Sequence, residues 1–366
     1  MLSLMLLPVL FGINLASSHF ALPVSPATTH SQLRYKLETR FIGRFHPSAD
    51  SFSFSCQWPG SSVETVGMAP SIDVAFEPET DNDRWQIEVD GIPTGILKLQ
   101  EGANNYSIPL LGPGRKVVRL IKRSEAFQGT TKFLGFYSSQ QFKSKPPAAP
   151  NRSIEIIGDS ISAGFGVDGK TKDEKYSPET ANAYLTYGMI AGRDLKADVT
   201  VIAWSGKKMW SDNDIPSIYD SILPSQTAPN TSPSWDFKKA QKPNAVVINL
   251  ATNDFGKGIP DEKGWTSAYL AFVQRVRKNY PKAFIYLATG SMMSDTWPVG
   301  KNHLTTVKRY LDTVQSLSKD SRIKRVDFAV QDERDGIGSS YHPNAVTQRK
   351  MALVLEEKLK QDLKWR

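Results

Sequence analysis

A proline-rich segment divides this sequence into two parts with different patterns. It spans residues 143–150 and reads KSKPPAAP. Proline lacks a backbone N–H and stiffens the chain, so such a segment does not belong inside a sheet and is suited to connecting two units. The chain has 366 residues, more than one hydrophobic core usually organises. We therefore predict a linker at residues 143–152 between two domains.

Before the linker, residues 31–142 alternate between apolar and polar side chains in short runs. The runs end at turn-forming pairs such as Asp90-Gly91. Period two is the spacing of a strand with one buried face, and short strands between turns are typical of antiparallel sheets. This part is predicted to be an all-β sandwich. The clearest runs are 51–55, 72–76, 85–91 and 116–121.

After the linker, residues 153–366 alternate between apolar runs of strand length and segments long enough for helices. This order predicts an α/β domain, in which about five parallel strands form a doubly wound sheet with helical crossovers. Residues 345–363 carry apolar side chains at helical spacing and are predicted to close the domain. The predicted strands are 153–157, 199–204, 245–250, 284–288 and 326–330.

Residues 1–18 have the composition of a secretory signal peptide. An apolar run too short to span a bilayer is followed by small residues at positions 16–18. A buried N-terminal helix is the alternative. No other stretch is a candidate membrane span, so we predict a secreted, extracellular protein that does not bind membranes. Three Asn-x-Ser/Thr sequons agree with a glycoprotein; they start at Asn105, Asn151 and Asn230.

Cysteine content and charge limit the function further. Cys56 is the only cysteine, which excludes an intrachain disulfide, and its neighbours Phe54 and Trp58 indicate a packed core position. The net charge is +8, but lysine and arginine are scattered along the chain rather than gathered in a stripe. We therefore predict a mild attraction to acidic surfaces and no nucleic-acid binding.

Small and polar residues follow the predicted parallel strands. In an open α/β sheet the carboxyl ends of the strands meet at one edge, where loops form the reactive site. The first strand ends at Gly158-Asp159-Ser160, which places a serine there, although Gly-Asp-Ser is also an ordinary turn composition. Later segments add candidate groups at the same edge: Trp204-Ser205-Gly206-Lys207, Ala251-Thr252-Asn253-Asp254 and Tyr341-His342-Pro343-Asn344.

Among five histidines, His342 is the best candidate for a general base. A serine hydroxyl becomes a good nucleophile only when a neighbouring imidazole accepts its proton. His342 lies on a loop at the predicted catalytic edge. The others lie in or near the leader, in the sandwich, or just before a predicted helix at 304–317: His19, His30, His46 and His303.

Taken in order, Ser160, Gly206, Asn253 and His342 resemble the signature of the SGNH (GDSL-type) hydrolases. The resemblance implies a flavodoxin-like α/β domain in which the serine attacks an acyl carbonyl with the histidine as base. It also implies an oxyanion hole made by the amides of Ser160 and Gly206 and the side chain of Asn253. Each such donor typically contributes about 3 kcal/mol, and these donors suffice without a metal or cofactor.

The residues before His342 depart from the common pattern of that family. Many SGNH hydrolases have an acid two or three residues before the histidine, where this chain has Ser340 and Ser339. A carboxylate at that place orients the imidazole. The arrangement in this chain resembles that of members with a Ser-His dyad, in which a backbone carbonyl orients the histidine. Asp335 or Asp332 is the alternative, as a third acid on a loop that folds back.

Segments of the first part resemble carbohydrate esterase family 2. They are FSCQWPG at 54–60, VDGIP at 89–93, KRSEA at 122–126 and FLGF at 133–136, followed by IGDSISAGFG at 157–166. That family joins a jelly-roll sandwich to an SGNH domain and removes acetyl groups from xylan and glucomannan, favouring the sugar 6-position. The resemblance implies a secreted acetyl esterase, of acetylxylan-esterase type, acting on acetylated plant cell-wall polysaccharides or oligosaccharides.

Aromatic residues in the second part suit a sugar ligand. Sugars present apolar C–H faces edged by hydroxyls, which match aromatic rings flanked by polar groups. Trp210 and Trp297 follow predicted strands and are candidates for stacking on a sugar, and Asp254 is a candidate for holding its hydroxyls. The alternative is that these tryptophans fill the core.

Two other functions are compatible with the same sequence. One is a lipid or aryl esterase of the same fold, which would have a wide apolar acyl pocket. The other is a non-catalytic carbohydrate-binding protein in which the sandwich is the working part.

Overall fold

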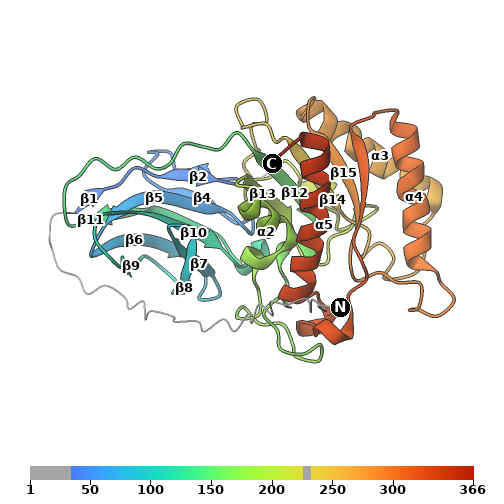
Figure 1. Cartoon of the computed structure of the whole chain (residues 1–366), viewed down its shortest axis with the longest axis horizontal. Helices are drawn as coiled ribbons and strands as arrows, with labels where there is room; N and C mark the ends of the chain where they lie inside the picture. Colours follow the sequence, from blue (N-terminus) through green and yellow to red (C-terminus); the bar gives the residue numbers. More distant parts are fainter. Residues whose placement is uncertain (1–33, 226–231) are drawn as a thin grey trace, which may run out of the picture.

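The computed structural model describes residues 34–225 and 232–366. The predicted signal peptide and the start of the sequon at Asn230 lie outside the described residues. The molecule is elongated, with a β-sandwich at one end and an α/β unit at the other (Figure 1). This arrangement confirms the predicted fold class of both parts.

The sandwich consists of two antiparallel sheets. One has the order β3-β4-β11-β6-β9, with β1 also paired to β11, and the other has the order β2-β5-β10-β7-β8. The first sheet contains β1 (Tyr35–Lys36), β3 (His46–Pro47), β4 (Phe54–Cys56), β6 (Ser71–Pro78), β9 (Asn104–Pro109) and β11 (Thr131–Ser138). The second contains β2 (Arg40–Ile42), β5 (Ser62–Met68), β7 (Arg84–Val89), β8 (Ile92–Lys98) and β10 (Arg115–Lys122).

Alternation along the strands builds the core between these sheets. In β6, Ile72, Val74 and Phe76 are buried, while Asp73 between them is half-buried. Successive side chains of a strand point to opposite faces, so one face of the sheet is apolar. Cys56 is fully buried in the same core, as predicted, and burial raises the pKa of its thiol to about 12.

The second unit has a parallel five-stranded sheet of order β13-β12-β14-β15-β16. Its strands are β12 (Ser153–Gly158), β13 (Asp198–Ala203), β14 (Ala245–Asn249), β15 (Phe284–Thr289) and β16 (Ile323–Asp327). The α-helices are α1 (Ser160–Ala163), α2 (Tyr187–Asp194), α3 (Glu262–Asn279), α4 (His303–Ser318) and α5 (Ala345–Leu363). Short 3₁₀ helices are η1 (Ala126–Gln128), η2 (Ala183–Leu185), η3 (Pro216–Ile218), η4 (Glu333–Asp335) and η5 (Ser339–Tyr341).

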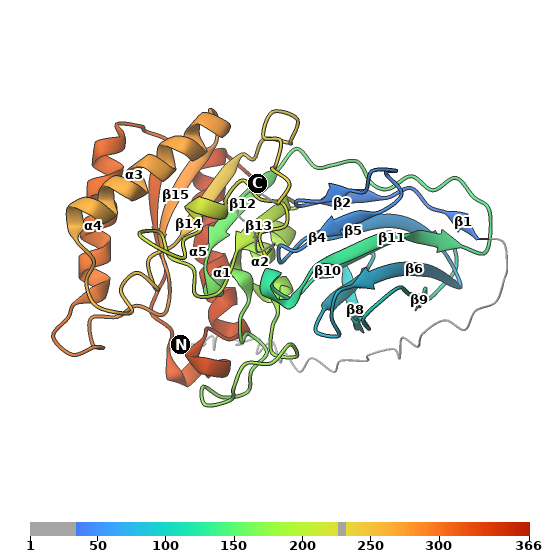
Figure 2. The same ribbon diagram turned by 180° about the vertical axis from the view of Figure 1, so that it is seen from behind.

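Helices cover both faces of the parallel sheet. One core cluster contains residues of α3 and α4, and the other contains residues of α2 and α5. Figure 2 shows β12, β13 and α2 beside the sandwich, with α3 and α4 at the far end. Among the helices that the structure describes, none is long and apolar enough to cross a membrane.

The last strand differs from its predicted position. The sequence predicts a strand at 326–330, but β16 ends at Asp327. β16 is an edge strand with a mixed burial pattern: Ile323 packs in the core cluster with α3 and α4, Val326 packs in the cluster with α2 and α5, and Lys324 and Arg325 between them are half-buried. Two basic residues interrupt this edge strand, so it has no continuous apolar run, and the apolar residues of 326–330 place the predicted strand too far toward the carboxyl end.

A buried arginine connects the two units. Arg44 of the sandwich is fully buried and lies 3.5 Å from Glu155 in the middle of β12. Glu155 also accepts hydrogen bonds from Tyr219 Oη at 2.6 Å and Tyr280 Oη at 2.9 Å. Breaking a buried ion pair of this kind typically destabilises a protein by about 3–5 kcal/mol, so the network fixes how the units dock.

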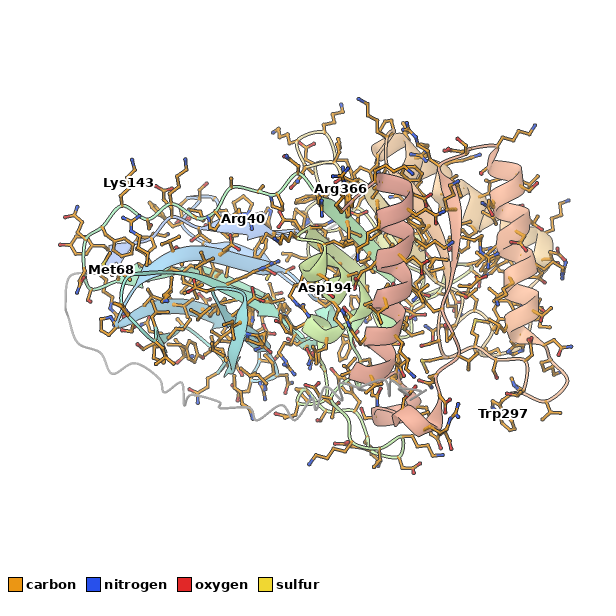
Figure 3. All side chains as sticks on the ribbon, viewed as in Figure 1. Arg40, Met68, Lys143, Asp194, Trp297 and Arg366 are labelled. Carbon is orange, nitrogen blue, oxygen red and sulfur yellow. The ribbon has the colours of Figure 1, made fainter. Side chains whose placement is uncertain are left out.

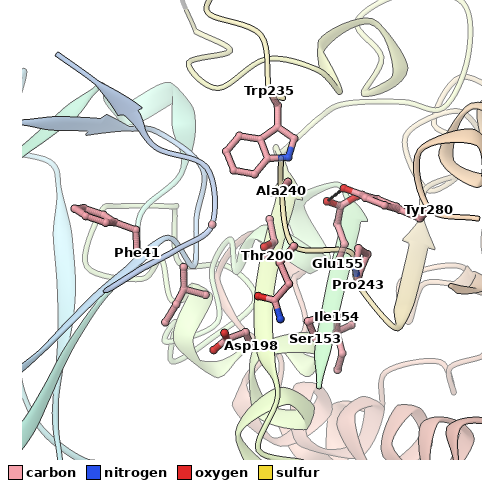
Figure 4. A pocket seen from close by; sticks show the side chains of 13 residues that line it. Phe41, Ser153, Ile154, Glu155, Asp198, Thr200, Trp235, Ala240, Pro243 and Tyr280 are labelled. Carbon is pink, nitrogen blue, oxygen red and sulfur yellow. Dashed lines mark hydrogen bonds between the residues drawn. The ribbon is translucent and has the colours of Figure 1, made fainter. Parts of the chain in front are cut away.

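A cavity of about 150 Å³ lies beside this network (Figure 4). Its walls include Phe41 and Trp235, together with Ser153 and Asp198, which begin β12 and β13. It therefore opens at the amino ends of the strands. Reactive loops of an open α/β sheet gather at the carboxyl ends, so the candidate active site is at the opposite edge.

Candidate active site

Ser160 lies at the carboxyl end of the central strand β12. The strand stops at Gly158, and Asp159 caps the short helix α1 by accepting a 3.0 Å hydrogen bond from the Ile161 amide. Glycine is required at 158 because a Cβ there would lie 2.2 Å from Ser162 Oγ. This tight turn fixes Ser160 as the first residue of the helix, with a side chain that is almost fully buried.

The parallel register brings the neighbouring strand ends to the same level. Gly158 pairs with Ala203 at the end of β13 and with Asn249 at the end of β14. Gly206 follows β13 by a short loop and has a φ of 78°, in the left-handed region that favours glycine. Ser160, Gly206 and Asn253 therefore follow three adjacent strands at one edge of the sheet.

Asn253 links two of these loops. Its side-chain Nδ2 donates a 2.9 Å hydrogen bond to the Lys207 carbonyl, next to Gly206. A carboxamide carries two N–H donors, so one can hold the loop while the other is directed to a ligand.

His342 lies on a strained loop after η5. Ser340 and Tyr341 have φ values of 52° and 63°, in the left-handed region that such residues rarely adopt. His342 Nδ1 is 2.8 Å from the Ser340 carbonyl, which can only accept, so Nδ1 carries the proton and Nε2 remains the basic nitrogen. The imidazole packs against the Phe165 ring at 4.4 Å, and the Phe165 amide donates to the Ser160 carbonyl at 3.1 Å.

Burial favours the neutral form of the His342 imidazole. Desolvation lowers the pKa of His342 below the ordinary value of 6.5, against the opposing effect of the backbone carbonyls. A neutral imidazole is the form that can accept the proton of a serine hydroxyl.

Neither candidate third acid contacts His342 among the described residues. The Asp335 carboxylate bonds Lys350 at 2.5 Å, and Asp332 forms a bidentate pair with Arg334. The Ser340 carbonyl takes the position on Nδ1 that an acid occupies in a triad. The described residues thus orient the imidazole through a backbone carbonyl and not through a carboxylate.

Asp254 lies in a network of hydrogen bonds at the catalytic edge. Its two oxygens accept hydrogen bonds from the amides of Met209 and Trp210, at 2.9 and 3.0 Å, and from Trp265 Nε1 at 3.0 Å. Burial raises the pKa of Asp254 to about 6. The carboxylate therefore holds the 209–210 loop, and its contact with sugar hydroxyls stays a prediction.

The two tryptophans predicted to stack on sugar lie in different surroundings. Trp210 is half-buried, and a Cβ at Gly264 would lie 2.6 Å from its ring, so much of the ring packs on α3. Trp297 is 75% exposed and sits on a loop at the side of the molecule away from the sandwich (Figure 3). The core-filling alternative therefore describes Trp210 in part, whereas Trp297 is free of the core.

The sandwich supplies two residues that the sequence analysis missed. Glu125 and Phe127, in and beside η1, contact the loop after β13: the Glu125 carboxylate bonds Ser205, and the Phe127 ring lies 6.5 Å from Trp204. Glu125 lies in the segment 122–126 that resembles the family, but neither that segment nor Phe127 indicates in the sequence which loop it contacts. Their position depends on how the two units dock.

Known families match both parts of the chain. Residues 156–350, more than half of the chain, match the GDSL-like lipase/acylhydrolase family. Residues 41–147 match the N-terminal region of carbohydrate esterase 2.

Named relatives cover nearly the whole chain. It is 33% identical over 341 residues to the cellulase/esterase CelE of Acetivibrio thermocellus, spanning 89% of this chain and 39% of that longer protein. It is 27% identical to an acetylxylan esterase / glucomannan deacetylase of Cellvibrio japonicus, over 93% of both proteins. A family two carbohydrate esterase from Clostridium thermocellum, solved in complex with cellohexaose, is 31% identical with a TM-score of 0.80, covering 90% of this chain and 100% of that one.

The fold and the groups at its strand ends define an ester hydrolase of the GDSL (SGNH) class. Within this class, the chain belongs to carbohydrate esterase family 2. The predicted family is confirmed.

Proposed function

We propose that this protein is a secreted esterase that removes O-acetyl groups, at the sugar 6-position, from plant cell-wall polysaccharides such as xylan or glucomannan. The observation that carries the proposal is that Ser160, Gly206 and Asn253 follow three adjacent strands. A histidine whose Nδ1 is held by a carbonyl supports it, because this imidazole packs on Phe165, and the Phe165 amide donates to the Ser160 carbonyl. The acetylated-polysaccharide substrates in the names of its relatives support the choice of substrate.

The reaction is a two-step acyl transfer. Ser160 Oγ attacks the acetyl carbonyl carbon while His342 Nε2 takes the hydroxyl proton. The resulting oxyanion accepts hydrogen bonds from the amides of Ser160 and Gly206 and from Asn253 Nδ2. His342 returns the proton to the departing sugar oxygen, which leaves an acetyl-enzyme. Water, deprotonated by His342, then releases acetate and restores Ser160.

Exposed aromatic rings around the catalytic edge suit a polysaccharide. Tyr341, next to the catalytic histidine, is 54% exposed, and Phe127 on the sandwich is 42% exposed. Phe127 borders an open groove of about 540 Å³ whose other walls include Thr80, Asn82 and Tyr176. Aromatic faces and polar edges in one groove match the C–H faces and hydroxyls of a sugar chain. We propose that the main chain of the polymer lies along this groove.

The test is release of acetate by the purified protein from acetylated glucomannan, acetylated xylan and cellobiose acetates, measured side by side. We expect release from at least one polymer and loss of the 6-O-acetyl signal by NMR. On synthetic esters, we expect acetyl to be hydrolysed faster than longer acyl chains. A preference for long acyl chains would support the lipid-esterase alternative, and polymer binding without acetate release would support the non-catalytic one.

A further inference from the structure

We propose that Glu125 of the sandwich is a positioning residue for the oxyanion hole and acts through Ser205 on the Gly206 amide. This inference rests on the proposed function. It assigns to the N-terminal domain a part in the chemical step and not only in substrate binding.

The contact is short and bidentate. One oxygen of the Glu125 carboxylate accepts a 2.8 Å hydrogen bond from the Ser205 amide, and the other accepts a 2.7 Å hydrogen bond from Ser205 Oγ. Ser205 is the residue before Gly206, and the two share the peptide unit that carries the Gly206 N–H. A residue held by both its amide and its side chain has a fixed position, so the direction of the next N–H is also fixed.

The Glu125 carboxylate lies in a buried position, where a charged group is energetically unfavourable. Glu125 is completely buried, and burial raises its pKa to about 7. In the part of the chain that the structure describes, no lysine, arginine or histidine forms an ion pair with it. Burying a carboxylate without a cationic partner is unfavourable, and residues that carry such a cost are enriched at functional sites.

The segment that carries Glu125 is itself anchored to the sandwich. The Glu125 amide donates to Gln128 Oε1 at 2.8 Å, and the Gln128 carbonyl accepts from Thr80 Oγ1 at 2.7 Å. Ala126, between them, is completely buried. The carboxylate is thus presented from a rigid turn, which suits a group that must hold a loop of the other domain.

The effect on the reaction follows from the geometry of oxyanion stabilisation. A donor contributes only when it points at the position where charge develops, and a misplacement of about 1 Å can lower the rate about a hundredfold. Gly206 has a left-handed φ, and glycine can adopt many other conformations. Without the contact between Glu125 and Ser205, the loop would therefore relax to other conformations. Loss of Glu125 should therefore reduce kcat while substrate still binds.

Two variants of Glu125 and one labelling reaction test this inference. In Glu125→Ala, we expect kcat on 4-nitrophenyl acetate to fall by about 10- to 100-fold, with KM changed by less than about threefold. In Glu125→Gln, the amide oxygen can accept from the Ser205 N–H and the NH₂ can donate to Ser205 Oγ, so most of kcat should return. Reaction of Ser160 with a fluorophosphonate, which forms a tetrahedral adduct in the same oxyanion hole, should slow in parallel with kcat.

A third variant covers the case in which the alanine protein does not fold. Ser205→Ala removes only one of the two hydrogen bonds and leaves the buried carboxylate in place, and kcat should fall by about three- to tenfold. Unchanged kcat in a folded Glu125→Ala or Ser205→Ala protein would overturn the inference. So would a loss of kcat in Glu125→Ala that Glu125→Gln does not restore.

These outcomes differ from a failure of the proposed function. If the proposed function is wrong, the wild-type protein itself will not hydrolyse acetyl esters, or Ser160→Ala will retain activity. If only this inference is wrong, Ser160→Ala will be inactive while Glu125→Ala remains fully active.

Discussion

The two sides of the candidate active site are built in opposite ways. On the α/β side, Ser160 and Asn253 follow buried strands, and the chain turns directly into the site. On the sandwich side, Glu125 and Phe127 belong to a short turn after β10 and reach the site only because the units dock. In the proposed function this difference is a division of tasks: the α/β side supplies the reacting groups, and the sandwich side positions a loop and contacts the polymer.

Of the changes that compare the two sides, Asn253→Ala on the α/β side is expected to have the largest effect on kcat. Removing one oxyanion donor should lower kcat by about 10²–10³ on small esters and on polymers alike. Because Asn253 also bonds the Lys207 carbonyl, the thermal unfolding midpoint should be measured as a control. If kcat of the folded variant falls by less than about tenfold on all substrates, Asn253 is not a donor of the oxyanion hole.

A change on the sandwich side should affect a polymeric substrate and not a small ester. Phe127→Ala should raise KM for acetylated glucomannan by about fivefold, because one aromatic contact with a ligand contributes about 1 kcal/mol, and leave kinetics on 4-nitrophenyl acetate unchanged. Phe52, another exposed phenylalanine of the sandwich outside the groove, provides the matched control as Phe52→Ala. Equal effects of the two variants on the polymer would contradict the proposed groove.

Changes at the two aspartates near His342 should have small effects. Asp335→Asn and Asp332→Asn each disrupt a pair with a neighbouring cation, and neither residue contacts the imidazole among the described residues. Each should change kcat/KM by less than about threefold, since exposed ion pairs contribute little. A loss of several orders of magnitude would reveal an acid that assists the histidine and would replace the dyad with a triad.

The smallest expected effect is the change of kcat/KM with pH, which depends on the protonation of His342. Only the neutral imidazole accepts the proton, so kcat/KM should rise with pH through the pKa of His342 and then level off. Because burial places this pKa below 6.5, kcat/KM at pH 6.5 should exceed half of its plateau value. A midpoint near 7 would point instead to Glu125 or Asp159, since burial raises both of their pKa values to about 7.

Much of the α/β side could be predicted from the sequence because its signals are local. The strands β12 and β14 are buried runs, and the candidate residue follows each within a few positions, so the run that ends at Gly158 places Ser160 at the carboxyl edge of the sheet. Strand β16 shows the limit, since two half-buried basic residues interrupt this edge strand and the apolar residues that follow displace its predicted position.

The sandwich side could not be predicted because its contacts join distant parts of the chain. Glu125 and Ser205 are 80 positions apart, and their contact depends on docking that the Arg44–Glu155 pair helps to fix. For Asp254, the turn composition correctly placed the residue at a strand end, but only the structure shows that its oxygens accept from Met209 and Trp210. Side-chain roles of this kind are set by three-dimensional neighbours and not by spacing.

The most direct test of the account is acetate release from acetylated glucomannan by the wild-type protein and by Ser160→Ala and His342→Ala. The account predicts that each variant folds normally, still binds the polymer, and releases acetate at least about 10⁴-fold more slowly than the wild type. Acetate release by a folded Ser160→Ala protein at a rate near that of the wild type would contradict it.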